Sequence, residues 1–197
     1  MTRGFEAAVL CVVAVAFPVT GLGQTSDSLS MTAKFHFHAE NVYSPLAIAG
    51  TAAYAGILQA DGAPKEWGQG AGAYGKRFAS TIAWSGIHSA LAFGLDSTLK
   101  QDPRYHRSGA TGFWRRSRHA LRETILTRTD SGREKLSTWR IGSAYGAAYL
   151  SNQWYPDRLN TARLGFIQGT VTLGFDLVSN LGTEFWPDLK SRVFHSN

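Results

Sequence analysis

Three titratable side chains in the apolar parts of the sequence have the chemistry of general acids, general bases or metal ligands. Asp176 and Glu184 stand eight residues apart, with Asn180 midway between them. Residues four apart share one face of a helix, so these three side chains line one side if the segment is helical. His88 is the one strongly polar side chain within residues 78–95. We therefore take Asp176, Glu184 and His88 as candidate catalytic residues.

The alternative is that these side chains hold the helices together. A buried carboxylate that pairs with an arginine can set how two helices pack without taking part in any reaction. The arginines that we consider as partners are Arg77, Arg104 and Arg116. For His88 the corresponding alternative is a core histidine that is hydrogen-bonded to a carbonyl or a carboxylate. The sequence leaves both interpretations open.

Positive charge is concentrated in residues 100–140, a connector between two apolar halves. This connector has a net charge of +7, whereas the rest of the chain sums to about −1. Arginine guanidinium groups bind phosphate through two parallel hydrogen bonds. The connector is therefore predicted to contact an anionic lipid surface or an envelope protein, with a merely solvated basic face as the alternative. The candidate anion-binding residues are Arg104, Arg107, Arg115, Arg116, Arg118 and Arg122.

Residues 1–23 have the pattern of a secretory signal peptide. Arg3 precedes an unbroken apolar run at residues 7–17, and Gly23 supplies a small residue before a cleavage site at Gln24. The alternatives are an uncleaved membrane anchor and a buried N-terminal helix. We therefore expect an exported protein, located in the periplasm, the cell membrane or the outer membrane. Nucleic acid is scarce there, so we do not expect it as a partner.

Motifs for nucleotide, metal or nucleophile chemistry do not occur in the sequence. The glycine-rich residues 65–75 lack the Gly-Lys-Ser/Thr ending of a phosphate-binding loop. No serine stands in a G-x-S-x-G motif, and there is no H-E-x-x-H pair of zinc ligands. Cys11, the only cysteine, lies in the signal segment. We predict no cofactor and no metal site.

Apolar segments with small residues four apart predict closely packed helices. A further amphipathic helix is predicted at residues 113–126, with Phe113, Leu121 and Ile125 on one side and arginines around the remainder. The predicted fold is mostly α: a compact bundle of about four to six glycine- and alanine-rich helices with the basic connector. The apolar helical segments are residues 45–60, 78–95, 137–152 and 161–182.

Two stretches have patterns that differ from these helices. Residues 170–177 alternate between polar and apolar, as a strand of an outer-membrane β-barrel does, and that barrel is the alternative fold. Residues 35–38 alternate phenylalanine with histidine, which predicts an extended edge. We place this edge in a flexible N-terminal lead-in, residues 24–42, followed by a single helical domain at residues 43–197.

Two segments have the length needed to cross the core of a bilayer, about 20 residues: 78–95 and 164–182. We therefore predict membrane association, either integral or peripheral. Glycines four apart also allow helices of two copies to meet, so we expect a homo-oligomer through these faces. The glycines concerned are Gly142 with Gly146 and Gly165 with Gly169.

Five short motifs together carry a family resemblance. They are QDPRY at 101–105, FWxR at 113–116, TRxDSG at 127–132, SNxxYP at 151–156 and NLxxEFWPD at 180–188. In this combination the chain resembles an uncharacterised family of exported bacterial proteins that is frequent in acidobacterial genomes, over roughly residues 67–190. The resemblance implies a mostly helical fold. It implies no activity, and no catalytic residue is carried over from it.

Taken together, these patterns predict an exported cell-envelope protein: a membrane-associated helical bundle whose basic surface binds anionic lipid or a partner. The alternative is an envelope enzyme that acts on a phosphorylated lipid or glycan. In that case Asp176, Glu184 and His88 are its acid, base or metal groups, and the connector arginines hold the phosphate.

Overall fold

The computed structural model describes residues 28–194, and the predicted signal peptide at residues 1–23 lies outside this part of the chain. Helices account for 75% of the described residues, and the other regular element among them is a two-stranded hairpin. The predicted mostly α bundle is therefore confirmed.

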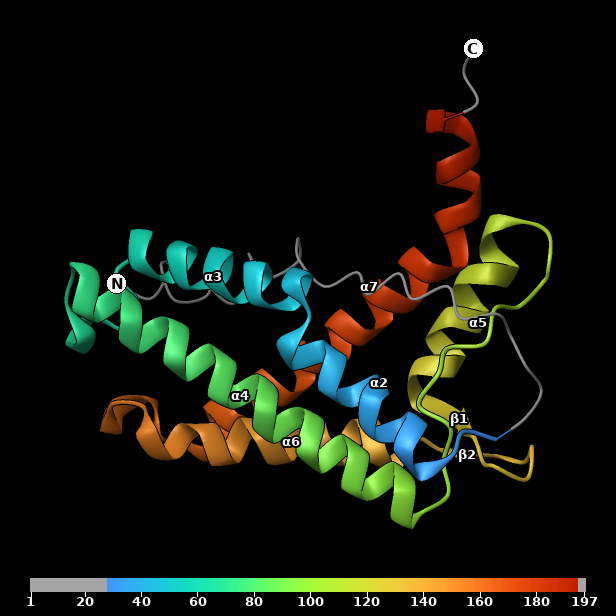
Figure 1. The fold of residues 1–197 in the computed structure, drawn as a ribbon, viewed down its shortest axis with the longest axis horizontal. Coiled ribbons are helices and arrows are strands. Elements are labelled where there is room, and N and C mark those ends of the chain that lie inside the picture. The colour runs from blue at the N-terminus through green and yellow to red at the C-terminus, as the bar shows by residue number, and fades with distance from the viewer. Residues whose placement is uncertain (1–27, 195–197) are drawn as a thin grey trace.

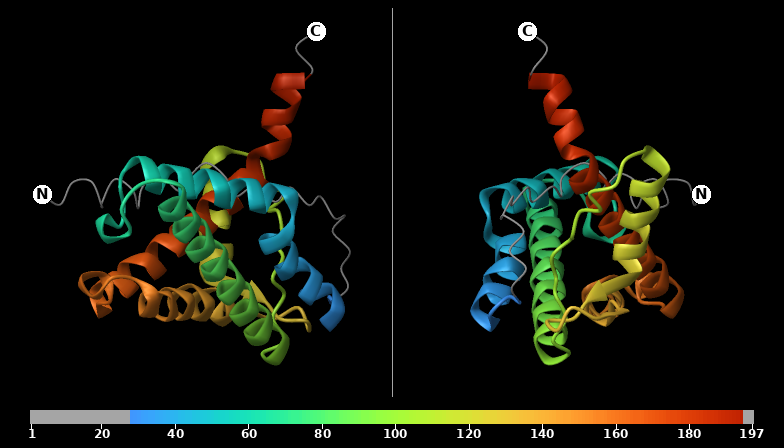
Figure 2. Two further views of the ribbon diagram at one scale, coloured as in Figure 1. Left: turned by 60° about the vertical axis from the view of Figure 1, so that its left-hand side comes forward. Right: turned by 90° about the vertical axis from the view of Figure 1, so that its right-hand side faces the viewer.

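The helices pack around a central pair, α4 and α6, which lie side by side (Figure 1). α2 and α3 pack against α4, and α7 packs along α6. α5 packs against α7 at one end of the molecule, next to the hairpin (Figure 2). The helices are α2 (Met31–Tyr43), α3 (Pro45–Ala60), α4 (Ala71–Thr98), α5 (Phe113–Ile125), α6 (Thr138–Ser151) and α7 (Ala162–Phe194); the strands are β1 (Leu126–Arg128) and β2 (Glu134–Leu136).

Local signals in the sequence set several helix ends. The Ser44 hydroxyl accepts a hydrogen bond from the backbone N–H of Ala47 at 3.3 Å, and Pro45 is the first residue of α3, as predicted. The turn predicted at residues 130–132 joins β1 to β2, where Gly132 has a φ of 80° that favours glycine.

Glycine allows the close approach of α4, α6 and α7. A Cβ atom at Gly142 would come within 2.7 Å of the Leu95 side chain, closer than two carbon atoms can pack. The four predicted interface glycines are Gly142, Gly146, Gly165 and Gly169, and they face, in the same order, Leu95, Leu91, Tyr149 and Tyr145. All four contacts are within one chain, and a homo-oligomer through these faces stays a prediction.

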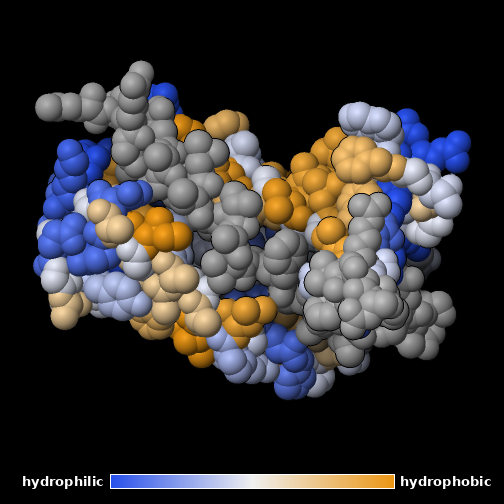
Figure 3. Space-filling model, turned by 90° about the horizontal axis from the view of Figure 1, so that it is seen from above, coloured by the Kyte–Doolittle hydropathy of each residue, from blue (hydrophilic) through white to orange (hydrophobic). Residues whose placement is uncertain are grey.

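The interior is built from small and polar side chains, and many large apolar side chains lie at the surface. The largest fully buried side chains include Arg77, Lys34, Glu184 and Asp96, whereas most of the buried apolar residues are alanines. Figure 3 shows hydrophobic residues at the surface between the two ends of the molecule, where hydrophilic residues gather. Exposed apolar patches of this kind mark places where a protein meets a partner or a membrane.

Two sequence predictions differ from the structure. Residues 35–38 are helical rather than extended, and most of the predicted flexible lead-in, residues 24–42, belongs to α2. α2 is part of the bundle because it buries Lys34 and His38 against other elements. The alternating residues 170–177, by contrast, are helical and lie within α7, in agreement with the helix predicted at residues 161–182.

The last helix is longer than predicted. The sequence predicted a helical segment at residues 161–182, but α7 continues through Pro187 to Phe194. Proline lacks the N–H that would bond one turn back, and α7 bends towards its C-terminal end (Figure 1). Residues 78–95 and 164–182 lie within α4 and α7. Among residues 28–194, no helix has the length and apolar character required to cross a membrane.

Candidate functional site

The polar row of α7 connects three parts of the protein. Asp176, Asn180 and Glu184 share one face of the helix, as predicted, and each faces a different partner. Asp176 lies 3.6 Å from the Arg140 guanidinium of α6, and Asn180 donates a hydrogen bond to the Thr124 hydroxyl of α5 at 2.9 Å. Glu184 bonds to the loop before α5 and to α5 itself. The row therefore joins α7 to α6, to α5 and to that loop.

Glu184 is the most completely bonded carboxylate of the row, with 1% of the residue exposed. It accepts hydrogen bonds from the Tyr105 hydroxyl at 2.7 Å, from both the backbone N–H and the hydroxyl of Ser108, and from Arg116 Nε at 3.3 Å. Burial acts to raise the pKa of Glu184, but these donors outweigh it and hold that pKa below its usual range. Glu184 is therefore a permanent anion at neutral pH, and a poor general acid.

Asp176 has a different environment. Burial raises the pKa of this carboxyl to about 6, against the opposing effect of Arg140. Asp176 Oδ2 and Arg140 Nε are both buried without a hydrogen-bond partner, although they are only 3.6 Å apart. The Arg140 guanidinium instead donates to the backbone carbonyl of Glu123 at 2.6 Å and stacks over Trp139. This ion pair is thus incompletely bonded, and the Asp176 carboxyl titrates close to neutral pH.

His88 lies on α4, between the side chains of Trp84 and Ser143. Its ring stacks on Trp84 with 5.2 Å between centroids, and its Nε2 atom lies 3.2 Å from the Ser143 hydroxyl. Burial, with the charges of His38 and Arg140, lowers the pKa of His88 to about 4. The imidazole is therefore neutral at physiological pH.

The three candidate catalytic residues do not share one set of partners. At 1.5 Å of rise per residue, Asp176 and Glu184 are about 12 Å apart along α7, farther than the carboxylate pairs that act on one bond. Residues 28–194 contain no group of three histidine, cysteine or acidic side chains placed to hold a metal ion. An enzymatic role for Asp176, Glu184 and His88 stays a prediction, while the predicted internal salt bridge is observed between Glu184 and Arg116.

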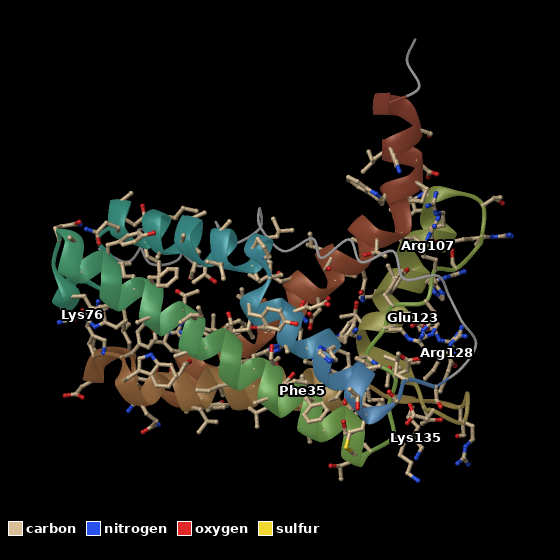
Figure 4. All side chains as sticks on the ribbon, in the orientation of Figure 1. Phe35, Lys76, Arg107, Glu123, Arg128 and Lys135 are labelled. Atoms are coloured by element: carbon tan, nitrogen blue, oxygen red, sulfur yellow. The ribbon has the colours of Figure 1, made fainter. Side chains whose placement is uncertain are left out.

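The predicted anion-binding arginines divide into two groups. Three of them pair with carboxylates: Arg104 with Asp102, Arg116 with both Glu184 and Asp188, and Arg122 with Glu134. The other three, Arg107, Arg115 and Arg118, are exposed. Figure 4 shows that Arg107, Arg128 and Lys135 lie on the side of the molecule formed by α5 and the hairpin, with Lys76 at the opposite end.

The outward side of α5 carries its apolar residues. Leu121 and Ile125 are 47% and 49% exposed, and Trp114 is 82% exposed. The buried side consists of Ala120, Glu123 and Thr124, next to Arg116. The polar side of this helix therefore faces the polar row of α7, and its apolar residues face outward. The exposed residues form one surface, here termed the α5 face: Trp114, Arg115, Arg118, Leu121, Arg122 and Ile125.

Sequence reasoning missed two buried basic side chains of α2. Lys34 of α2 has 2% of its surface exposed, donates to the carbonyl of Gln101 at 2.8 Å and pairs with Asp130 at 3.0 Å. In the same helix, His38 Nε2 lies 2.6 Å from the Asp96 carboxylate. No pattern in the neighbouring sequence predicts that Lys34 or His38 is buried, because each partner lies at least 58 positions away.

Arg77 also forms structural contacts rather than pairing with Glu184. Its guanidinium donates to the carbonyls of Ala63, Pro64 and Gly68 and to the side chain of Gln59. These bonds close the turn between α3 and α4.

Comparison with known proteins identifies no relative: no protein-family model, no curated protein and no solved structure matches this chain. The function of the exposed surface must therefore be inferred from its own residues.

Proposed function

We propose that this protein binds the surface of an anionic membrane through the α5 face. The observation that carries the proposal is the orientation of α5, which exposes Trp114, Leu121 and Ile125 while burying charged and polar side chains. A folded protein gains free energy by burying such residues, so their exposure indicates a second surface that covers them.

The arrangement of the α5 face matches a helix that lies in the plane of a membrane interface. Positions 114, 118, 121 and 125 are three or four residues apart and share one side of the helix. Helices of this type insert their apolar residues at the boundary with the acyl chains, and arginines reach the lipid head groups beside them. Tryptophan is enriched at this depth because its ring is apolar and its N–H is polar.

The positive charge of the α5 face favours an anionic bilayer as its binding partner. Arg115 and Arg118 are exposed on the α5 face, and Arg122 is exposed although it pairs with Glu134. More cations are exposed on the same side of the molecule, among them Arg107, Arg128 and Lys135. A cation near an anionic surface contributes about 1 kcal/mol of binding free energy. A solvated basic face would have no need for tryptophan, leucine and isoleucine among its arginines.

Binding to lipid vesicles tests this proposal. The full chain should sediment with vesicles that contain phosphatidylglycerol and remain in solution with vesicles of phosphatidylcholine alone. Replacing both Arg115 and Arg118 by Ala should weaken the partitioning by about 2 kcal/mol, or about 30-fold, and added salt should weaken it as well. Equal binding of the double variant and the parent chain would rule out the α5 face.

A matched double variant serves as the control. Lys76 and Arg163 are also exposed cations, but they lie outside the α5 face. The pair Lys76→Ala and Arg163→Ala changes the net charge by the same amount and should leave vesicle binding within about twofold of the parent. Trp114→Ala tests the apolar part, and it should weaken binding about tenfold or more because the ring then no longer inserts.

We further propose that binding takes place in the cell envelope, after export. The support for this is the signal-like pattern of residues 1–23. N-terminal sequencing of the protein from expressing cells should find Gln24 as the first residue. A chain that keeps Met1 and stays in the cytosolic fraction would contradict the location without affecting the vesicle experiment.

A further inference from the structure

The last turns of α7 project from the bundle beside the start of α5 (Figure 2). Two large apolar side chains in this part of α7 are exposed, Trp186 at 40% and Leu189 at 52%. Phe113, the first residue of α5, is 61% exposed. None of the three belongs to the α5 face. Exposing them to water is unfavourable in the same way, so they too indicate a surface that covers them.

These side chains are continuous with the α5 face. The Phe113 ring packs against Trp114 of that face and against Phe185 of α7, with centroids 5.3 Å and 5.4 Å apart. Leu189 follows Phe185 by one helical turn on the same side of α7, and Trp186 precedes Leu189 by three residues. The exposed apolar surface therefore extends from α5 onto α7. We term this extension the α7 edge, and it consists of Phe113, Phe185, Trp186 and Leu189.

Arg116 of α5 fixes the α7 edge relative to the α5 face. Its guanidinium stacks over Phe185 at 4.2 Å, lies 3.3 Å from the Glu184 carboxylate and pairs with Asp188. These contacts extend beyond Pro187, so they hold the part of α7 that follows the proline as well as the part before it. A surface that is already held in place loses little conformational entropy when it binds.

The charges around the α7 edge favour an anionic bilayer over a second copy of the chain. Residues 107–116 and 184–190 contain four cations and two carboxylates, which gives these segments a net charge of +2. Arg116 pairs with both carboxylates, and the other three cations are exposed: Arg107, Arg115 and Lys190. In a symmetric dimer through this edge, like charges would face each other. On a bilayer, Lys190 next to Leu189 reaches the head groups while the apolar side chain inserts.

We propose that the α7 edge is a second element of the membrane contact. Phe113, Trp186 and Leu189 enter the boundary between the head groups and the acyl chains, beside the α5 face. This inference rests on the proposed membrane binding and extends it to a second helix. A single helix on a bilayer can roll about its own axis, whereas two connected helices on the same bilayer fix the orientation of the protein.

Fluorescent labels at single positions test the inference on the full chain. Cys11→Ser removes the only cysteine, and Leu189→Cys then places a polarity-sensitive label in the α7 edge. On vesicles of phosphatidylcholine and phosphatidylglycerol, emission of this label should increase and shift to shorter wavelength, and lipids brominated on their acyl chains should quench it. Leu150→Cys is the matched control, because Leu150 of α6 is 48% exposed and lies outside both surfaces. Its label should stay in water.

Truncation of the same two leucines tests the contribution to binding. Leu189→Ala should weaken partitioning into these vesicles about fivefold or more, because less apolar surface then leaves water. Leu150→Ala should bind as the parent chain does.

The outcomes separate the α7 edge from the α5 face. If the parent chain sediments with the vesicles but the label at position 189 stays in water, or Leu189→Ala binds as tightly as the parent, the α7 edge is wrong and the α5 face stands. Equal insertion of the label at position 150 would also contradict a contact confined to this edge. If the parent chain does not bind the vesicles, both proposals fail. A parent dimer that Leu189→Ala converts to a monomer, without vesicle binding, would identify a second copy as the covering surface.

Discussion

Replacing Glu184 by Gln removes the negative charge at the point where α7, α5 and the loop before α5 meet. The substitution preserves the shape of the side chain but turns one acceptor oxygen into a donor, which then faces donors of Tyr105, Ser108 or Arg116. Removing one partner of a buried ion pair typically costs 3–5 kcal/mol, because the other charge stays buried. Arg116 keeps Asp188, so we expect a loss of about 3 kcal/mol of unfolding free energy.

Urea unfolding followed by circular dichroism measures this loss. With a slope of about 2 kcal/mol per molar urea, the midpoint should fall by about 1.5 M. Asp188→Asn is the matched control: it removes the other carboxylate from Arg116, but Asp188 is largely exposed, so the loss should stay below about 1 kcal/mol. Equal midpoints for the two variants would refute the view that Glu184 anchors α7.

The pH dependence of the same variant gives an independent check. The pKa of Glu184 is held below its usual range in the folded protein, so its carboxylate contributes stability above the pKa of the unfolded chain. This contribution is lost as the pH falls through the lower folded-state pKa. The parent chain should therefore lose its advantage over Glu184→Gln on acidification below about pH 4.5, the ordinary pKa of the group. A constant difference between the two chains from neutral to acidic pH would argue against the bonded carboxylate.

Three further predictions follow from buried groups. The pKa of Asp176 rises from 3.8 to about 6 on folding, so the parent chain should lose stability as the pH rises through this window. Asp176→Asn should not show this loss when urea midpoints are measured across the same pH range. Arg77→Ala removes four hydrogen bonds from the turn after α3 and should cost about 2–4 kcal/mol, measured by thermal unfolding; a change below 1 kcal/mol would contradict the bonding described. Gly142→Ala forces a Cβ against Leu95 and should cost about 1–3 kcal/mol, whereas Gly174→Ala has open space and should be neutral or slightly stabilising; the reverse order would contradict the close packing of α4 and α6.

Local patterns were sufficient for the helices other than α2 and for the shared face of the polar row. Ser44 and Pro45 define the start of α3, because a capping hydroxyl and a proline act on the first turn alone. Residues 176, 180 and 184 point in the same direction because their spacing is that of the helix itself. The glycines at 142 and 169 were predicted to lie at close helix contacts for the same reason, and they do.

Contacts between residues that lie far apart along the chain could not be predicted from the sequence. Asp176 pairs with Arg140 rather than with Arg77 or Arg104. Arg77 bonds to the turn between α3 and α4, and Arg104 pairs with Asp102 in its own loop. α2 is helical although residues 35–38 alternate, and the elements it packs against hold Lys34 and His38 through hydrogen bonds.

The orientation of α5 is the clearest case. Amphipathicity located this helix correctly, but the rule that apolar residues face inward fails when the interior is itself polar and charged. Helix spacing depends on backbone geometry within a few residues, so the sequence determines it alone. Which side of a helix is buried depends on what the rest of the chain presents to it, and only the tertiary structure decided that for α5 and for the surface proposed to bind lipid.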